Sequence, residues 1–564
     1  MPIALALITA AAAYKAANQA QSGCDDGEDM IYDTDIDTAG GTAHASPEDF
    51  IDPQFLEGLQ KIELLPLEQT LTMLEWPIST VTFFRSSSQE TMNEAIDRLE
   101  RRVHLLLQAN PWLTGWLVRG KGKGSFDQTP RIWYDPSGIR RPREHIVRRW
   151  PHSEVGIDDS TPYVDYESIL RAKCSVKTNP EIENRRSEAL FRVSVVGGAN
   201  NERDTGPTGG CERPTRKSDF ALIVSMSHIC GDGHTFYNIY NSILGHTPVV
   251  ELDPRREMTF TGKVQDKMGK REAFYVSHIS NDPVWMKMFQ RLGSDVASAN
   301  RSGSTHGEEH SDLGHRDPSK LGGRVFMLNK HYIGNLKAAH LTIDGSVKFD
   351  DIATSTLRSP MVPGNFDDDD EEETGSGHLT ESTNDILVSW LWQLIKPNVG
   401  LMAVNFRGRI ESVNESQVGN YANTIAYTDA DYASPMLIRK SLETCRRAGV
   451  DESGQPTVLP RAHSELTFSV ATNWSSFAHA SAFKRKGRAV EGDDGTTWFT
   501  EDIELIRHLP IVYPKKMLDR MPRRMSFFVI FSSGEDIGCF LIAPQCIMNE
   551  IDCCGIVKEV VAEF

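Results

Sequence analysis

The chain has 564 residues, of which 39% are apolar and 24% charged, and no stretch reaches the roughly 18 to 20 apolar residues that span a bilayer. It exceeds the ~250 to 300 residues at which one hydrophobic core stops growing, so its length predicts two domains. The net charge of -18 argues against a nucleic-acid surface, because such affinity comes largely from clustered Lys and Arg.

The N-terminal segment leaves the compartment open. Residues 1–13 are apolar and rich in small side chains, as in the apolar part of a signal peptide, but they lack its basic start. Residues 14–45 have no apolar periodicity, so we expect residues 1–45 to be a disordered or targeting segment. The cysteines form no C-x-x-C pair, which suits a reducing compartment. We predict a cytoplasmic protein, with an organelle or the secretory pathway as the alternative if residues 1–22 are cleaved.

The first structured elements have clear periodicity. Residues 91–107 carry apolar side chains at helical spacing and predict an amphipathic helix. Residues 111–118 and 131–134 then predict a hairpin around the glycine-lysine turn 120–124. That turn precedes a strand and lacks the spacing of a P-loop, so we do not expect it to bind phosphate.

Two apolar runs in the next part of the chain, 189–196 and 220–227, predict strands, and residues 235–244 predict a helix. Between the second strand and this helix stands His228-Ile-Cys-Gly-Asp232-Gly233. A second match to His-x-x-x-Asp-Gly begins at His340, at the end of a predicted helix. The first copy is favoured, because a strand that ends before a helix presents side chains at its carboxyl end.

The first copy has the composition of a base on a tight turn. An imidazole titrates near neutrality, so His228 is the candidate general base, with a histidine in an ordinary surface turn as the alternative. Asp232 lies beyond the turn, and we expect it to pair with an arginine and fix the loop. Gly231 and Gly233 allow a close backbone approach. Cys230 is interpreted as a packing residue rather than a nucleophile.

The second half alternates exposed and packed segments. Residues 294–323 are rich in Ser, Gly and His, and residues 364–380 hold an acidic run, so both predict exposed loops. Ser382 begins a capping box that opens an apolar helix over residues 386–395, and residues 526–531 and 538–542 predict a strand hairpin. The mixture of strands and helices predicts an α/β or α+β class.

Two other polar clusters were considered as sites. His306-Gly-Glu-Glu-His310 fits a zinc-binding spacing, but its Ser, Gly and Asp surroundings do not predict the required helix, so no metal site is expected. The basic run from Arg140 to Arg143, with Arg148 and Arg149, is interpreted as a solvated face.

Three further motifs follow His228 in a familiar order. They are Val404-Asn-Phe-Arg-Gly-Arg409, Val418-Gly-Asn-Tyr421 and Thr472-Asn-Trp474. With the first motif they resemble the chloramphenicol-acetyltransferase-like acyltransferase superfamily, especially its BAHD and fungal O-acyltransferase branch, over most of residues 55–545.

The resemblance implies a fold and a division of the chain. We expect two similar domains, each a mixed β-sheet flanked by helices, with the active-site channel between them. The N-terminal domain would cover residues 46–248, a crossover linker with a polar insertion 249–325, and the C-terminal domain 326–564 with the acidic insertion 364–380.

The resemblance also implies a mechanism and roles. Acyl-CoA would be the co-substrate and would react with the acceptor in a ternary complex, with His228 as base and no permanently bound cofactor. Thr472 and Trp474 are the candidate donors to the oxyanion. Asp232 would pair with Arg407, with Arg409 as the second choice. The remaining residues of the structural motifs are Gly231, Gly233, Asn405, Gly419 and Asn420.

One departure concerns the C-terminal motif of the family. Its Asp-Phe-Gly-Trp-Gly is absent, and the nearest segment is Ala482-Phe-Lys-Arg-Lys-Gly487. The substituted cations could hold the phosphates of coenzyme A, with a solvated loop as the alternative. These cations are Lys484, Arg485, Lys486 and Arg488.

The sequence therefore predicts an acyl-CoA-dependent O-acyltransferase acting on a hydroxyl, or an amine, of a small metabolite or lipid. We expect a monomer without nucleic-acid partners or a transmembrane segment. Two alternatives stay open: a wax-ester-synthase-like or condensation-domain-like transferase of the same superfamily, and a non-catalytic binding or scaffold member of the fold.

Overall fold

The computed structural model describes most of the chain after residue 49. The described residues are 50–69, 76–119, 129–197, 219–281, 320–342, 381–450, 457–460, 466–477, 490–491, 497–498, 503–512, 518, 521 and 524–564. The predictions for residues 1–45, the glycine-lysine turn, the His306–His310 cluster, the acidic insertion and the cations at 484–488 lie outside them. Within these ranges no helix has both the length and the apolar character needed to cross a bilayer.

The first sheet has five strands in the order β14-β2-β7-β6-β5. β2, β7 and β6 form its antiparallel centre, β14 pairs antiparallel with β2, and β5 is parallel to β6. The strands are β14 (Ile503–Pro510), β2 (Ile78–Ser86), β7 (Phe220–Met226), β6 (Phe191–Gly197) and β5 (Val147–Trp150).

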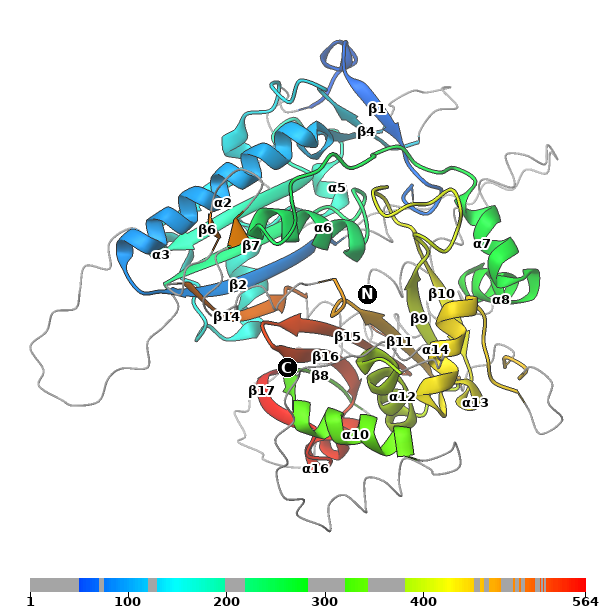
Figure 1. Cartoon of the computed structure of the whole chain (residues 1–564). Coiled ribbons are helices and arrows are strands. Elements are labelled where there is room, and N and C mark those ends of the chain that lie inside the picture. The colour runs from blue at the N-terminus through cyan, green and yellow to red at the C-terminus, as the bar shows by residue number, and fades with distance from the viewer. Residues whose placement is uncertain are drawn as a thin grey trace, which may run out of the picture.

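This sheet is buried on both faces, so its strands are almost continuously apolar. Phe84, Leu222 and Val224 share one core with α2 (Gln89–Ala109) and α6 (Gly233–Leu244), which lie on the same face (Figure 1). Val81 and Ile223 point the other way and join the core of the second sheet. Because successive side chains of a strand point to opposite faces, the two faces of this sheet belong to two different cores.

The second sheet is mixed and has seven strands in the order β10-β9-β11-β15-β16-β8-β17. β11 is parallel to β9 and β15, and the other neighbours are antiparallel. The strands are β10 (Ala422–Tyr427), β9 (Val399–Asn405), β11 (Phe468–Asn473), β15 (Met525–Ser533), β16 (Asp536–Pro544), β8 (Leu321–Leu328) and β17 (Val557–Glu563).

Helices also cover the second sheet. Figure 1 shows α10 (Lys330–Thr342), α12 (Thr383–Ile395) and α16 (Gln545–Cys553) below it. α12 begins in the predicted capping box, in which Ser382 and Asp385 exchange hydrogen bonds. The predicted α/β class, with two mixed sheets flanked by helices, is confirmed.

The remaining elements are short. Two small sheets pair β1 (Gln60–Glu63) with β4 (Arg131–Tyr134) and β3 (Trp116–Val118), and β12 (Val490–Glu491) with β13 (Thr497–Trp498). The other α-helices are α3 (His152–Val155), α4 (Tyr166–Arg171), α5 (Asn179–Ile182), α7 (Phe260–Met268), α8 (Lys270–Asn281), α13 (Asp429–Tyr432) and α14 (Pro435–Thr444). The 3-10 helices are η2 (Gln54–Leu56), η3 (Pro111–Thr114), η4 (Arg143–His145) and η5 (Tyr163–Asp165).

One strand crosses between the two halves of the chain. β14 follows β11 in sequence, yet it forms the edge of the first sheet beside β2 (Figure 1). Trp474, directly after β11, packs against both cores. The second half of the chain therefore contributes directly to the sheet that carries His228.

The local predictions meet two outcomes. The helix at 91–107, the hairpin of β3 and β4, and the C-terminal hairpin of β15 and β16 are confirmed. The prediction of a solvated basic face is wrong for Arg141, which is 2% exposed. Its guanidinium donates to the carbonyls of Thr114 and Gly115 and lies 4.6 Å from the Trp116 ring, so it is structural.

Candidate functional site

His228 lies in a tight connection between a buried strand and a helix. β7 ends at Met226, and α6 begins at Gly233. The turn is closed by the amide of Cys230, which donates to the carbonyl of Ser227 at 2.9 Å. Asp232 is the N-cap of α6, and its carboxylate accepts the amide of Thr235 at 3.1 Å.

Neighbouring side chains leave little room at the two glycines of the motif. A Cβ on Gly231 would lie 2.5 Å from the Cβ of Thr235, closer than real contacts allow. A Cβ on Gly233 would lie 3.1 Å from Nε1 of Trp474. The sequence predicted a close backbone approach at these glycines. In the structure Thr235 packs against Gly231, and Trp474 packs against Gly233.

His228 is 8% exposed, and its Nδ1 is buried without a hydrogen-bond partner among the described residues. Burial lowers the pKa of His228 below its ordinary value, although its own backbone carbonyl, the charge of Asp232 and Asn420 act in the opposite direction. The ring is therefore neutral at pH 7, the state in which an imidazole can accept a proton.

Asp232 forms the ion pair with Arg407 that the resemblance implied. Nη1 of Arg407 donates to the carboxylate at 2.7 Å, and both side chains are buried. Burial alone would raise the pKa of Asp232, but the charge and hydrogen bond of Arg407 hold it below its ordinary value. The other carboxylate contacts come from Thr235 and Tyr421, so the carboxylate is occupied by structural partners.

Arg407 also connects this turn to the second sheet. It donates to the carbonyls of Gln417 and Gly419 at 2.8 Å each and to Asn405 at 3.1 Å. Its guanidinium lies 5.0 Å from the Tyr421 ring centroid. Arg409 instead donates to the carbonyl of Leu442, so it is not the partner of Asp232.

A second buried ion pair, between Glu68 and Arg256, was missed in the sequence. Nε of Arg256 donates to Glu68 at 2.9 Å, and the two side chains are 1% and 0% exposed. Arg256 also donates to the carbonyls of Ile229 and Cys230 at 3.2 Å each, directly after His228. The available signal was weak: Glu68 is a charged residue beside the apolar run 64–67.

Asn420 joins this second pair to the base. Its backbone amide and its Nδ2 donate to Glu68 at 2.8 and 3.0 Å, and its Nδ2 also donates to the His228 carbonyl at 2.8 Å. Gly419 before it has a φ of +135°, and a Cβ there would lie 2.8 Å from Nε of Arg256. The Gly-Asn pair therefore fits closely between Arg256 and the turn.

Thr472 and Trp474 come from the second sheet. Thr472 is buried in β11, and the amide of Trp474 donates to the carbonyl of Ile530 at 2.7 Å, which extends the strand pairing. Residues two apart on an extended chain point to the same side. Trp474 contacts the first turn of α6 through Gly233, so the structure brings this motif to the beginning of the helix that follows His228.

The chain is similar to several solved structures over most of its length. TRI101 of F. sporotrichioides, in complex with coenzyme A and T-2, has 14% identity and a TM-score of 0.42, covering 87% of this chain and 97% of that chain. Vinorine synthase has 14% identity and a TM-score of 0.44, covering 90% and 96%. Polyketide synthase associated protein 5 from Mycobacterium tuberculosis has 12% identity and a TM-score of 0.41, covering 89% and 98%.

No family model and no curated protein matches the sequence. Because the identities are low, the likeness concerns the fold, and the chemistry of this chain has to be argued from its own site.

A second buried histidine, His508, forms a polar cluster with side chains of α6. His508, on β14, is 2% exposed, and both of its ring nitrogens are hydrogen-bonded. Nδ1 lies 2.8 Å from Oγ1 of Thr82 and 3.0 Å from the hydroxyl of Tyr240, and Nε2 lies 3.2 Å from the hydroxyl of Tyr237. Tyr237 and Tyr240 belong to α6, so this cluster connects the crossing strand to the helix that follows His228.

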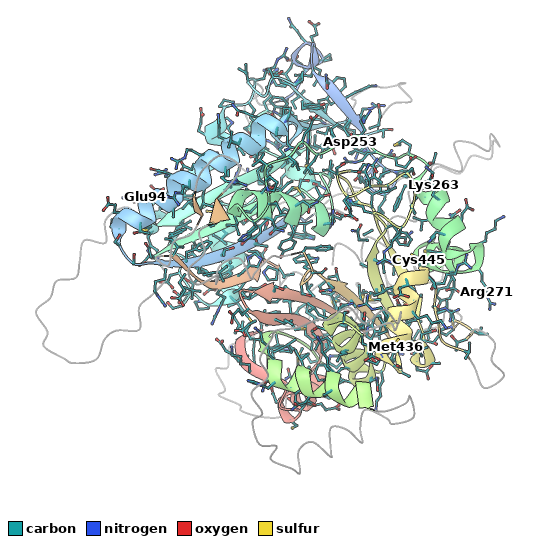
Figure 2. All side chains as sticks on the ribbon, viewed as in Figure 1. Glu94, Asp253, Lys263, Arg271, Met436 and Cys445 are labelled. Carbon is teal, nitrogen blue, oxygen red and sulfur yellow. The ribbon has the colours of Figure 1, made fainter. Side chains whose placement is uncertain are left out.

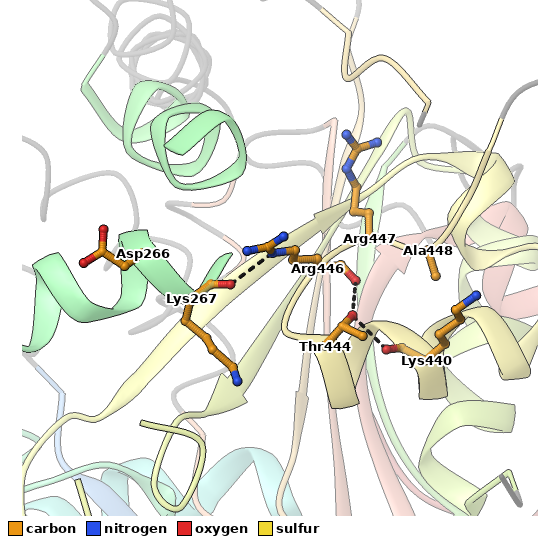
Figure 3. A pocket seen from close by; sticks show the side chains of 7 residues that line it. All are labelled: Asp266, Lys267, Lys440, Thr444, Arg446, Arg447 and Ala448. Carbon is orange, nitrogen blue, oxygen red and sulfur yellow. Dashed lines mark hydrogen bonds between the residues drawn. The ribbon is translucent and has the colours of Figure 1, made fainter. Parts of the chain in front are cut away.

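A hollow of about 540 Å³ lies between the C-terminal ends of α7 and α14. Its lining is basic, but Arg447 pairs with Glu272 at 2.8 Å and with Asp431 at 3.4 Å. Figure 3 shows Arg446 bonded to the carbonyl of Lys267, at 3.0 Å. Cations at the C-terminal ends of helices interact favourably with the helix dipole, so these side chains have structural roles.

In the described part of the chain, no group of three or more His, Cys, Asp or Glu residues could hold a metal ion.

Proposed function

We propose that this protein transfers an acyl group from acyl-CoA to a hydroxyl, or an amine, of a small metabolite or lipid, with His228 as general base. The observation that carries the proposal is the state of His228 itself. Its ring is almost fully buried, its Nδ1 lacks a hydrogen-bond partner among the described residues, and its backbone carbonyl is held by Asn420, in the segment before β10. Buried polar groups are normally paired, so an unpaired ring nitrogen on a fixed turn supports a role in binding or chemistry.

The mechanism follows from the neutral imidazole. His228 removes the proton of the acceptor as its oxygen attacks the thioester carbonyl, and a tetrahedral oxyanion forms. The carbon-sulfur bond then breaks, and the proton returns from His228 to the coenzyme A sulfur. Acyl transfer is direct, because Cys230 is fully buried and burial raises the pKa of its thiol to about 12, which makes it a poor nucleophile.

Thr472 and Trp474 are proposed as donors to the oxyanion. Trp474 lies against Gly233 at the beginning of α6, five residues after the base, and Thr472 precedes it by two residues in β11, which supports this role. The loss of one such donor typically costs about 10² to 10³ in rate. Thr472→Val should therefore lower kcat, whereas Ser475→Ala, three residues further along the chain, should have little effect.

The donor site for coenzyme A is proposed at the cation cluster Lys484, Arg485, Lys486 and Arg488. In a chain of net charge -18, such a cluster would attract phosphates. Charge reversal to Glu should raise the KM for acyl-CoA and leave kcat almost unchanged. The matched control is acyl-pantetheine without phosphates, whose KM should not change. An unchanged KM for acyl-CoA would place the phosphates elsewhere.

Thiol release tests the function directly. The purified protein is incubated with a panel of acyl-CoAs and alcohols, and free thiol and acylated product are measured. His228→Ala should lower the rate by about 10² to 10⁴, and His340→Ala should not. Loss of activity in His340→Ala would overturn the choice of His228 as the base. Acyl-CoA binding without acceptor-dependent thiol release would instead support a non-catalytic member of the fold.

A further inference from the structure

The ion pair of Glu68 and Arg256 lies behind the turn that carries His228, and the proposed chemistry does not use it. Removing two charges from water is costly, and replacing such a pair by apolar groups often leaves stability unchanged. Stability alone is therefore a weak reason for this pair. Its hydrogen bonds indicate a different reason, because they converge on the backbone around the base.

Arg256 uses its full set of donors. One N–H goes to Glu68, and the other four go to backbone carbonyls at 2.8 to 3.2 Å. The acceptor residues are Pro254, Val418, Ile229 and Cys230. A guanidinium has five N–H groups in a fixed plane, whereas a lysine ammonium has three on a flexible stem. Arg256 therefore fixes the His228 turn to residue 418, in the segment that precedes β10.

Glu68 holds the other side of the same turn. One oxygen accepts Arg256 and the amide of Leu65 at 2.9 Å each, and the other accepts both nitrogens of Asn420. Since Asn420 donates to the His228 carbonyl, Glu68 reaches the base through a single residue. Figure 2 labels Asp253 and Lys263, which mark the stretch of chain that contains Arg256.

We propose that Glu68 and Arg256 are positioning residues for His228, which fix the carbonyls of residues 228 to 230 so that the imidazole stays aimed at the acceptor. The proposal rests on the proposed function of His228 as a base. Small displacements of a reacting group are costly, since about 1 Å can lower a rate by 10²-fold. Loss of the pair should therefore act on kcat rather than on substrate binding.

Arg256→Lys and Glu68→Gln test this with separate measurements of kcat and KM. We expect kcat to fall about 10-fold to 100-fold, with KM for acyl-CoA within about threefold of wild type. The matched control is the buried pair of Arg447 and Asp431, whose side chains are 4% and 1% exposed. Asp431→Asn should lower the melting temperature and leave the kcat of the folded protein unchanged. Equal effects on kcat in both pairs, or no effect in either, would overturn the proposal.

A pH profile separates positioning from general loosening. Glu68 and Asp232 raise the pKa of His228 against the effect of burial, and Arg256 and Arg407 are the cations beside them. Glu68→Gln removes a negative charge, so the acidic limb of kcat/KM should move to lower pH. Arg256→Lys keeps its charge, so its limb should stay near that of wild type. If the acidic limb of kcat/KM does not move in Glu68→Gln, the proposed influence of Glu68 on His228 is contradicted.

Hydrogen exchange distinguishes this proposal from the proposed function. If wild type releases no thiol with any acyl-CoA, the proposed function fails. The backbone amides of residues 227–232 should still exchange faster in Arg256→Lys than in Asp431→Asn if the pair holds the turn. Equal exchange in the two variants would show that the pair does not fix the His228 backbone.

Discussion

His228 and His508 are both almost fully buried, yet their ring nitrogens have different surroundings. Nδ1 of His228 has no hydrogen-bond partner among the described residues, whereas His508 bonds Thr82, Tyr240 and Tyr237. Burial lowers the pKa of both rings, that of His508 to about 3. A lowered pKa therefore does not identify the reactive histidine. The unsatisfied ring nitrogen of His228 and the hydrogen bonds that hold the backbone around it are what support the proposal that His228 is the base.

The two histidines also differ in what they connect. Around His228, the charged pairs Asp232–Arg407 and Glu68–Arg256 hold the backbone of a turn and leave Nδ1 of the ring without a hydrogen-bond partner among the described residues. Around His508, neutral hydroxyls hold the ring itself. A ring held in this way can stabilise the packing of β14 on α6. The comparison predicts that His228 serves activity and His508 serves stability.

The largest expected effect is on activity at His228. His228→Ala should lower thiol release by about 10² to 10⁴, because the acceptor proton loses its base. Removal of this buried ring leaves a cavity, but its Nδ1 has no hydrogen-bond partner to lose among the described residues, so stability should fall by less than in His508→Ala. Circular dichroism during heating, together with initial rates, checks both. A large loss of melting temperature in this variant would break the comparison.

The second effect is on stability at His508. His508→Ala removes the ring that three hydroxyls contact, although those of Thr82 and Tyr240 still contact each other at 2.7 Å, and it creates a cavity. The unfolding free energy should therefore fall by about 2 to 4 kcal/mol. Urea unfolding measures the change. The folded fraction should keep kcat within about threefold of wild type, and Asn238→Ala, at a half-buried position of α6, is a mild control. Loss of kcat without loss of stability would assign His508 to the chemistry instead.

The sequence predicted the elements around His228 better than the contacts between them. Strand, turn and helix followed from periodicity, whereas the N-cap role of Asp232 was not predicted and is seen only in the structure. These features depend on residues close in sequence. The pairing with Arg407 spans 175 positions and came from resemblance, because spacing alone does not determine which arginine reaches the carboxylate.

Other features were hidden because they depend on packing between distant segments. Glu68 and Arg256 are 188 positions apart, and neither lies in a motif. β14 was not expected in the first sheet, since strand pairing across 400 positions leaves no local pattern. His508 received no role for the same reason. These residues stand out because they are charged or polar and yet buried outside any motif. Their burial is visible only in the folded structure.

A third prediction concerns stability in acid. The pKa of His508 is lowered from 6.5 to about 3, so below pH 6.5 the unfolded chain binds a proton that the folded protein does not. Stability from this group is complete above pH 6.5 and should fall by about 1.4 kcal/mol per pH unit until it levels off near pH 3. His508→Gln should have a shallower slope than wild type when unfolding is measured from pH 7 to 5. If the unfolding free energies of wild type and His508→Gln change in parallel with pH, the His508 ring is not held neutral in the folded protein.

The smallest effect sharpens the comparison within the His508 cluster. Tyr237→Phe removes one hydroxyl, at 3.2 Å from Nε2, and should cost about 1 kcal/mol. Tyr240→Phe should cost more, because its hydroxyl contacts Nδ1 of His508 at 3.0 Å and Oγ1 of Thr82 at 2.7 Å. Both variants keep the aromatic ring, including the Tyr237 ring whose centroid lies 6.2 Å from that of Trp474, so kcat should not change. A fall in kcat for Tyr237→Phe alone would mean that this hydroxyl influences the site through α6, and the two histidines would then not act independently.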